Sequence, residues 1–237
     1  MQIVAIGGGE MKSRETFKID QFIVELTGKQ NPRALFIPTA SGDAVGYWNT
    51  FQNIYEKALG CRTDSLFLLS RDRTKNCFEE KILNADLIYV GGGNSLKMMK
   101  LWRRLGVDRL LEKAGKRGSV LSGLSAGGIC WHERGHSDSL SFSSQKEWSY
   151  IRVKGLGFRK GIFCPHLDAE KRRKPFLQMM MRHGGIGIAC DNNAAVWYDD
   201  EKAVVKTSHA KAMVSLFRGK KGNIVEEKYK DGEVFEV

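Results

Sequence analysis

The chain has 237 residues, of which 42% are hydrophobic and four are proline, and its formal net charge is +11 at pH 7. This length and composition suit a globular protein with a sizeable core and argue against a disordered chain. No apolar run approaches the ~18 to 20 residues of a membrane span, and the first residues lack the pattern of a signal peptide, so we expect neither segment.

Charge and cysteine usage narrow the class further. The pI is near 9.5, but the basic residues are dispersed and are not interleaved with aromatic residues, so we expect no nucleic-acid partner. The more natural interpretation of the net positive charge is an electrostatic field that attracts small acidic substrates. The five cysteines are odd in number, scattered and without a CxxC pair. They indicate reduced thiols in a cytoplasmic protein, with no metal site and no disulfide framework.

The first half of the chain alternates short apolar runs with amphipathic segments. Strands are predicted at 3–6, 33–39, 65–69, 85–90 and 119–124, and helices at 15–26, 48–59, 78–83, 96–105 and 107–114. This alternation is typical of βαβ units in a mostly parallel sheet that is covered by helices on both faces.

The second half changes character. We expect a polar surface loop at 136–150, a strand at 161–164, a strongly basic helix at 168–182 that restarts at Pro175, and shorter strands at 185–190, 194–198, 203–206 and 213–217. The later strands are predicted to run antiparallel at the sheet edge. No linker divides the chain, so a single domain over 1–237 is expected.

The run Gly123-Leu124-Ser125-Ala126-Gly127 follows the apolar strand predicted at 119–124. A strand, a Gly-x-Ser-x-Gly turn and a helix start form the pattern of a nucleophile elbow, which exposes the serine hydroxyl at the carboxyl edge of a sheet. The alternative is a tight turn in which Ser125 only caps the helix.

Two glycine runs, residues 7–9 and 91–93, also follow predicted strands. Neither continues as G-x-G-x-x-G, so no dinucleotide or other cofactor is expected. The run 91–93 can bring backbone N–H groups beside Ser125 as oxyanion-hole donors. Its alternative use is as a helix cap with Asn94 or Ser95.

A serine nucleophile needs a base. His166 follows the strand at 161–164 and a stiffening proline, which places it at the same sheet edge as Ser125. His132 and His136 lie too near the elbow, and His183 and His209 fit a helix end and an exposed loop. The leading candidate for the acid that orients this histidine is Asp138, and the alternatives are Glu133, Glu147 and Asp191.

Gly91-Gly92-Gly93-Asn94, the Ser125 turn and Pro165-His166, in this order, resemble the peptidase E family (S51) of serine peptidases, which groups α-aspartyl dipeptidases with cyanophycinases. The resemblance covers most of the chain, through 185–188. It implies a fold like that of class I glutamine amidotransferases, a flavodoxin-like three-layer arrangement, with serine in place of their cysteine.

The same resemblance implies Ser125 as nucleophile, His166 as general base, and the N–H groups of Gly92 and Ala126 as the oxyanion hole. In the dipeptidases an Asn-Asp pair between the elbow and the histidine supplies the acid. Here Ser137-Asp138 matches that pair best, whereas cyanophycinases use glutamate.

In the dipeptidases an arginine after the histidine binds the N-terminal aspartate of the substrate. The resemblance therefore implies Arg172 or Arg173 as a substrate-binding residue, and the alternative is a solvated basic helix face. The function predicted is that of a serine peptidase acting on short peptides, such as dipeptides with an N-terminal aspartate. The alternatives are a cyanophycinase-like peptidase and a non-catalytic binder of an acidic ligand. The partner expected is a small peptide, and the sequence leaves homo-oligomerisation undetermined.

Overall fold

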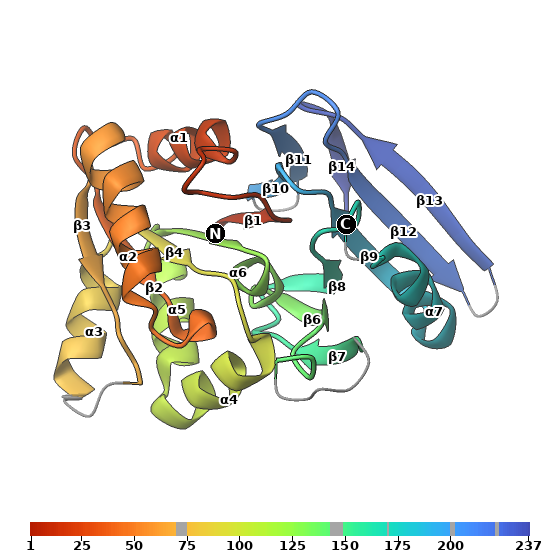
Figure 1. The fold of residues 1–237 in the computed structure, drawn as a ribbon, viewed down its shortest axis with the longest axis horizontal. Coiled ribbons are helices and arrows are strands. Elements are labelled where there is room, and N and C mark those ends of the chain that lie inside the picture. Colours follow the sequence, from red (N-terminus) through yellow and green to blue (C-terminus); the bar gives the residue numbers. More distant parts are fainter. Residues whose placement is uncertain (70–74, 143–148, 170, 200–201, 221–222) are drawn as a thin grey trace.

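The computed structural model describes residues 1–69, 75–142, 149–169, 171–199, 202–220 and 223–237 (Figure 1). Its larger sheet has eight strands in the order β14 (Val234–Glu236), β11 (Lys202–Thr207), β10 (Ala194–Asp199), β1 (Gln2–Ile6), β5 (Val120–Leu124), β4 (Leu87–Val90), β2 (Arg33–Ile37) and β3 (Arg62–Ser65). The strands from β1 to β3 pair in parallel, whereas β10, β11 and β14 pair antiparallel.

Alternate side chains of the parallel strands enter two different cores, which is why both faces carry helices. Val4 and Ile6 pack with α1 (Phe17–Glu25), with α2 (Val45–Phe51) and with the π-helical segment η2 (Gln52–Ala58) that continues α2. Ile3 and Ala5 belong to the core that includes α3 (Lys75–Asn84), α4 (Ser95–Leu105) and α5 (Val107–Lys116). Strands buried on both faces are expected to be apolar, and the fully buried residues 3–6 of β1 and all of β4 are.

A second sheet of six strands lies beside the first (Figure 1). Its order is β13 (Asn223–Tyr229), β12 (Val214–Lys220), β9 (Gly185–Cys190), β8 (Arg159–Cys164), β6 (His132–Ser137) and β7 (Ile151–Lys154). The helix α7 (Arg173–His183) covers one face through Phe176 and Met180. The opposite face contributes Phe163 and Leu216 to the core of the first sheet. The expectation of a single domain stays a prediction, and the shared core is consistent with it.

The predicted parallel sheet with helices on both faces is present, but the prediction for the later strands was only partly right. The runs at 194–198 and 203–206 do extend the edge of the first sheet as β10 and β11. Those at 185–190 and 213–217 instead become β9 and β12 in the second sheet, because apolar alternation does not specify which sheet a strand joins. The likeness to class I glutamine amidotransferases stays a prediction.

Three local predictions were wrong. The third strand is β3, which ends at Ser65, where the predicted strand begins; as an edge strand it is polar and half exposed. The expected loop at 136–150 begins inside β6, and His136 and Ser137 are fully buried. The helix expected from 168 begins at Arg173, with Pro175 in its first turn, where a missing N–H costs nothing. The strands β6, β7, β13 and β14 were not predicted.

The topology brings three chain segments to one edge of the first sheet. β1, β5 and β4 are neighbours and run parallel, so their carboxyl ends meet there. The segments that follow them are the glycine run 7–9, Ser125 and the glycine run 91–93. A short 3-10 helix, η1 (Thr39–Ser41), follows β2 at the same edge. No helix in the described ranges combines the length and the apolar character that crossing a membrane requires.

Candidate active site

Ser125 occupies a strained turn between β5 and the four-residue helix α6 (Ala126–Ile129). Its φ is 54° and its ψ is −105°, a region that non-glycine residues rarely adopt and that is typical of functional sites. The turn is held because Ser125 N–H donates to the Ile6 carbonyl at 3.0 Å and Ile129 N–H donates to the Ser125 carbonyl at 2.9 Å. A Cβ on Gly127 would lie 2.1 Å from the Val90 carbonyl oxygen, so only glycine fits there.

His166 follows β8 in the second sheet and also has a positive φ, of 51°. Its Nδ1 lies 2.7 Å from Oδ1 of Asn192, in the loop between β9 and β10. The Asn192 backbone N–H in turn donates to Asp168 Oδ1 at 2.8 Å. A Cβ on Gly8 would lie 2.2 Å from both His166 Nδ1 and Asn192 Oδ1. The first glycine run therefore makes room for the His166–Asn192 pair at the end of β1.

Ser125 and His166 line one cavity of about 430 Å³, hereafter the catalytic cavity. The predicted pair thus meets at one hollow although the two residues come from different sheets. The cavity wall also includes Gly92 and Gly93 from the second glycine run and charged residues of both signs, among them Glu10 and Lys12. Within the described ranges, no group of three or more His, Cys, Asp or Glu side chains is arranged to hold a metal ion.

The two residues expected to form the oxyanion hole flank Ser125. A Cβ built on Gly92 would lie 3.6 Å from the Ser125 Cβ, so the Gly92 backbone runs beside the serine. The Gly92 N–H donates to the Tyr47 hydroxyl over a long 3.5 Å. Burial raises the pKa of Tyr47 well above its usual range, so this hydroxyl stays protonated. Ala126 is the first residue of α6, and the first N–H groups of a helix have no partner within the helix.

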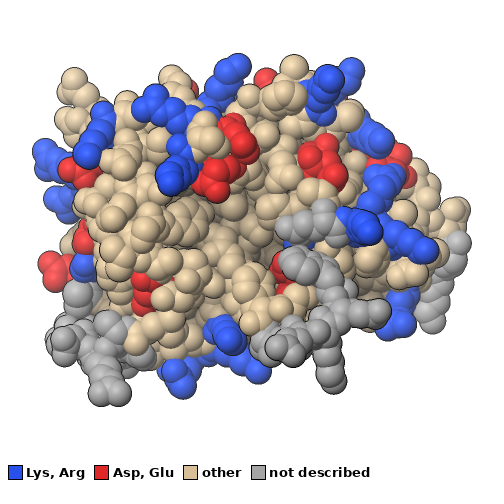
Figure 2. All heavy atoms as spheres, viewed as in Figure 1, with Lys and Arg blue, Asp and Glu red and all other residues tan. Residues whose placement is uncertain are grey.

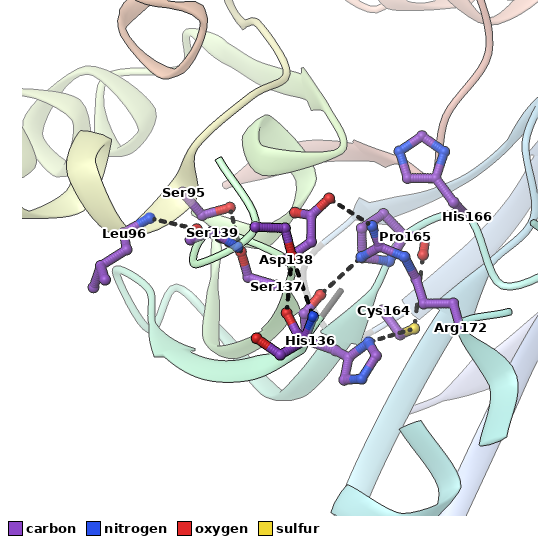
Figure 3. A network of polar contacts seen from close by, with 12 residues as sticks. Ser95, Leu96, His136, Ser137, Asp138, Ser139, Cys164, Pro165, His166 and Arg172 are labelled. Atoms are coloured by element: carbon purple, nitrogen blue, oxygen red, sulfur yellow. Dashed lines mark hydrogen bonds and ion pairs between the residues drawn. The ribbon is translucent and has the colours of Figure 1, made fainter. Parts of the chain in front are cut away.

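Asp138 contacts Arg172 and was expected to contact His166. Its Oδ2 lies 3.3 Å from Nη2 of Arg172, whose Nη1 donates to the His136 carbonyl at 3.1 Å (Figure 3). The Arg172 side chain is only 1% exposed and stacks over the Tyr150 ring. The contacts at Nδ1 of His166 therefore favour Asn192 for the orienting role that we expected of Asp138.

The alternative acids are also engaged elsewhere. Glu133 accepts a hydrogen bond from the Gly161 N–H at 3.0 Å. Asp191 accepts one from the Met213 N–H at 3.1 Å, and burial, with a smaller contribution from Asp168, raises the pKa of Asp191 to about 6. Glu147 lies outside the described residues.

The two expected substrate-binding arginines are placed differently. Arg172 lines the catalytic cavity but is paired with Asp138 there. Arg173 begins α7, forms a two-point ion pair with Glu226 of β13, and does not line the catalytic cavity. The alternative of a solvated basic helix face therefore fails for Arg172, which is buried, whereas Arg173 is exposed and paired with Glu226.

The histidines set aside in the sequence are buried or remote. His132 bonds Tyr198 through Nε2 at 2.8 Å, and burial lowers its pKa to about 4. His136 lies on β6 near Cys164, and burial lowers its pKa to about 3. Both are kept from Ser125 because α6 is a single turn that leads directly into β6. His183 ends α7, as predicted.

Asn192 is the residue of this site that the sequence did not reveal. It belongs to the polar run Asp191-Asn192-Asn193, which directly follows β9. Its position after a strand was the available signal, since polar residues at carboxyl ends of strands are the usual source of functional groups. A set of serines was also missed: Ser137 and Ser139 link β6 to Ser95 and the Leu96 N–H at the start of α4 (Figure 3).

A serine in a strained turn after a parallel strand and a histidine held by an amide line one cavity of an α/β fold, which is the arrangement expected of a serine-nucleophile site. The sequence model of peptidase family S51 matches residues 3–206, and the chain belongs to this family. It is 35% identical over 217 residues to the uncharacterized peptidase YgaJ of Bacillus subtilis (strain 168), covering 89% of this chain and 90% of that protein.

Two solved structures share the fold. A peptidase from an acI-B1 Actinobacterium aligns with a TM-score of 0.75 at 20% identity, over 100% of this chain and 96% of that one. A protein named after peptidase E from Listeria monocytogenes EGD-e aligns with a TM-score of 0.67 at 18% identity, over 87% of this chain and 98% of that one. At these identities the likeness establishes the fold.

Proposed function

We propose that this S51 member is a serine peptidase that hydrolyses short peptides through an acyl-enzyme on Ser125. The observation that carries the proposal is the shared catalytic cavity: Ser125, at a positive φ, and His166, held by Asn192, both line it. A volume of about 430 Å³ suits a short peptide end better than a folded protein chain.

The hydrogen bond to Asn192 sets the protonation of the base. An amide oxygen accepts, so Nδ1 of His166 donates in this pair, and in our proposal the lone pair of Nε2 serves as the base. In the proposed first step Nε2 takes the Ser125 hydroxyl proton while Oγ attacks the substrate carbonyl carbon. The Gly92 and Ala126 N–H groups then hold the oxyanion.

The intermediate collapses as the C–N bond breaks, and the proton on Nε2 passes to the leaving amine. A water molecule then attacks the Ser125 ester and gives its proton to Nε2 of His166. When the ester C–O bond breaks, that proton returns to Oγ and the free acid leaves. The sum is one water consumed and one peptide bond cleaved.

A neutral amide in the orienting position has a chemical consequence. Asparagine fixes the tautomer of a histidine, as in papain-like Cys-His-Asn sites, but adds no negative charge to stabilise an imidazolium. In our proposal Asn192 has this positioning role, and Asp138 holds Arg172 in the cavity wall. Recognition of an N-terminal aspartate by Arg172 stays a prediction, since Asp138 already offsets its charge.

A fluorophosphonate probe tests the proposal, because it reacts with an activated serine. We expect stoichiometric labelling at Ser125 and turnover of some members of a panel of Asp-Xaa, Glu-Xaa and neutral dipeptides. Ser125→Ala should lose both. Ser122→Ala is the matched control, because this buried serine of the same strand bonds the Ile88 carbonyl and does not line the cavity. An unlabelled wild-type protein would reject the mechanism and favour a non-catalytic binder. Labelling that persists in Ser125→Ala would reject Ser125 as the nucleophile.

A further inference from the structure

The charges around the catalytic cavity leave the recognition of acidic peptides unassigned. Arg172 is offset by Asp138 and Arg173 by Glu226. Lys12 is exposed at the cavity wall, close in the chain to Glu10, which also lines it. The catalytic cavity by itself is therefore of mixed charge.

A second cavity of about 620 Å³, hereafter the α4 cavity, adjoins the first. Phe142 lines both cavities. The chain also passes directly from one to the other, because Gly93 lines the catalytic cavity and Asn94, the next residue, lines the α4 cavity. A peptide that leaves the catalytic cavity past Phe142 therefore reaches the α4 cavity.

Among the described residues, the charged lining of the α4 cavity is positive. Lys97, Lys100 and Arg104 line it from the exposed face of α4, and the other described lining residues carry no charge. Within the described ranges none of the three forms an ion pair, unlike Lys113 and Lys116 on the neighbouring helix. Figure 2 shows Lys and Arg side chains grouped at the lower edge of the molecule, where α4 lies.

The same cavity has an exposed apolar rim. Leu69 is 47% exposed and Phe142 is 57% exposed, and both line the α4 cavity. A row of cations on a helix is usually just a solvated face, and single exposed apolar residues are ordinary. Here unpaired cations and exposed apolar side chains lie together in a hollow next to the candidate nucleophile, which is the composition of a binding site.

We propose that the α4 cavity binds an acidic segment of the substrate, on the carboxyl side of the bond held over Ser125. This inference rests on the proposed peptidase function and names its substrate class: short peptides with carboxylates beyond the scissile bond. Lys97 and Arg104 are seven residues apart, which corresponds to roughly 10 Å along a helix at 1.5 Å per residue. An extended peptide covers that distance in about three residues at 3.3 Å each.

The strength of the preference follows from the exposure of these cations. An exposed ion pair changes an equilibrium by about two- to fivefold, and salt screens it. Two carboxylates on this row should therefore raise kcat/KM about tenfold at low salt. The ratio of kcat/KM for the acidic peptide to that for a neutral one should fall towards one at about 1 M salt, where the Debye length is about 3 Å.

The test compares two peptides that differ only in charge. Both carry the dipeptide unit that the enzyme cleaves best, extended at its carboxyl end by Gly-Asp-Gly-Asp in one and by the isosteric Gly-Asn-Gly-Asn in the other. The readout is the ratio of their kcat/KM values. The variant Lys97→Gln/Lys100→Gln/Arg104→Gln should bring the ratio from about ten to within about twofold of one. The control variant Arg109→Gln/Lys113→Gln/Lys116→Gln on α5 removes the same charge and should keep the wild-type ratio.

A ratio near one in the wild-type protein, or a ratio that survives the α4 variant, overturns the inference. With Ser125 labelling and turnover of the Asn peptide intact, the proposed peptidase function stands in that case. If labelling and turnover both fail, the peptidase proposal fails instead. Fluorescence anisotropy of the two labelled peptides on Ser125→Ala protein then still decides the α4 site. Tighter binding of the Asp peptide that is lost in the α4 variant supports it, and equal binding of both peptides overturns it.

Discussion

Gly127→Ala should damage the site while changing a residue that has no chemistry of its own. The added Cβ would lie 2.1 Å from the Val90 carbonyl oxygen, whereas real Cβ atoms essentially never approach within 3.0 Å. Val90 ends a central strand paired on both sides, so its carbonyl cannot yield. The four-residue helix α6 must therefore move by at least the difference, about 0.9 Å, and it carries Ser125 and Ala126 with it.

The size of this displacement sets the expected loss of activity. Misplacing reacting groups by about 1 Å costs roughly 10²-fold in rate, and overpacking costs about 1 to 3 kcal/mol of stability. We expect kcat/KM and the second-order rate of fluorophosphonate labelling to fall together by about 10²-fold, with a native circular dichroism spectrum. Gly219→Ala is the control, because its Cβ would meet nothing closer than 3.5 Å. Folded Gly127→Ala protein labelled within twofold of the wild-type rate would refute this reasoning.

Two further predictions concern other side chains. Asn192→Ala removes a neutral hydrogen bond worth about 1 to 1.5 kcal/mol, so kcat should fall about five- to tenfold. Asn192→Asp should restore activity and shift the pH profile of kcat upwards, because a carboxylate raises the pKa of His166. An unshifted pH profile in Asn192→Asp contradicts the positioning role. Burial raises the pKa of Asp20, which bonds Thr16 and Tyr55, to about 7 from 3.8. The folded state therefore keeps this proton to higher pH than the unfolded chain, so stability should fall by on the order of 4 kcal/mol as pH rises from about 4 to 7. In urea unfolding, the free energy of unfolding of Asp20→Asn should not fall in this way between about pH 4 and 7. An equal dependence of that free energy on pH in both proteins contradicts the prediction.

The parts of the site that the sequence predicts are those fixed by local geometry. A Gly-x-Ser-x-Gly turn after an apolar strand constrains the backbone within five residues, so the strained Ser125 could be placed from the sequence. Parallel alternation then fixes which strand ends share an edge, which brings the run 91–93 beside it. His166 was also predicted from its position just after a strand, but β8 belongs to the second sheet, so its place beside Ser125 depends on how the two sheets pack.

Asn192 and the partner of Asp138 depend on contacts that no local pattern records. Asn192 reaches His166 only because β9 pairs with β8 in the second sheet and the next strand, β10, crosses to pair with β1 in the first. A polar run after a strand is common, and nothing within 191–193 distinguishes the member that faces a histidine. Asp138 led because Ser137-Asp138 matched the acid-bearing pair of the resembled dipeptidases best, but folding buries Arg172 beside it, and a buried guanidinium requires a carboxylate.

The division of the later strands between two sheets explains how one cavity joins groups from distant parts of the chain. Ser125 belongs to the first sheet and His166 to the second, and the loop that contains Asn192 connects them. Gly8 is where this loop meets β1: it forms an isolated bridge with Asn192, and its carbonyl accepts from the Asn193 N–H at 2.8 Å. A side chain at position 8 would overlap the His166 ring and the Asn192 amide, so glycine at this position makes room for the pair that we propose forms the base.

The positive net charge of the chain can be related to substrate binding only when the ion pairs of the individual cations are taken into account. The two arginines that follow His166 in the chain were the expected binders of a substrate carboxylate, yet folding gives both of them partners, Asp138 and Glu226. A cation that is already neutralised adds little attraction for a further anion. In our proposal the cations that select acidic peptides are those on α4, where Lys97, Lys100 and Arg104 have no ion pair among the described residues. Residual charge along the proposed path of the peptide is therefore a better guide to specificity than nearness to His166 in the chain.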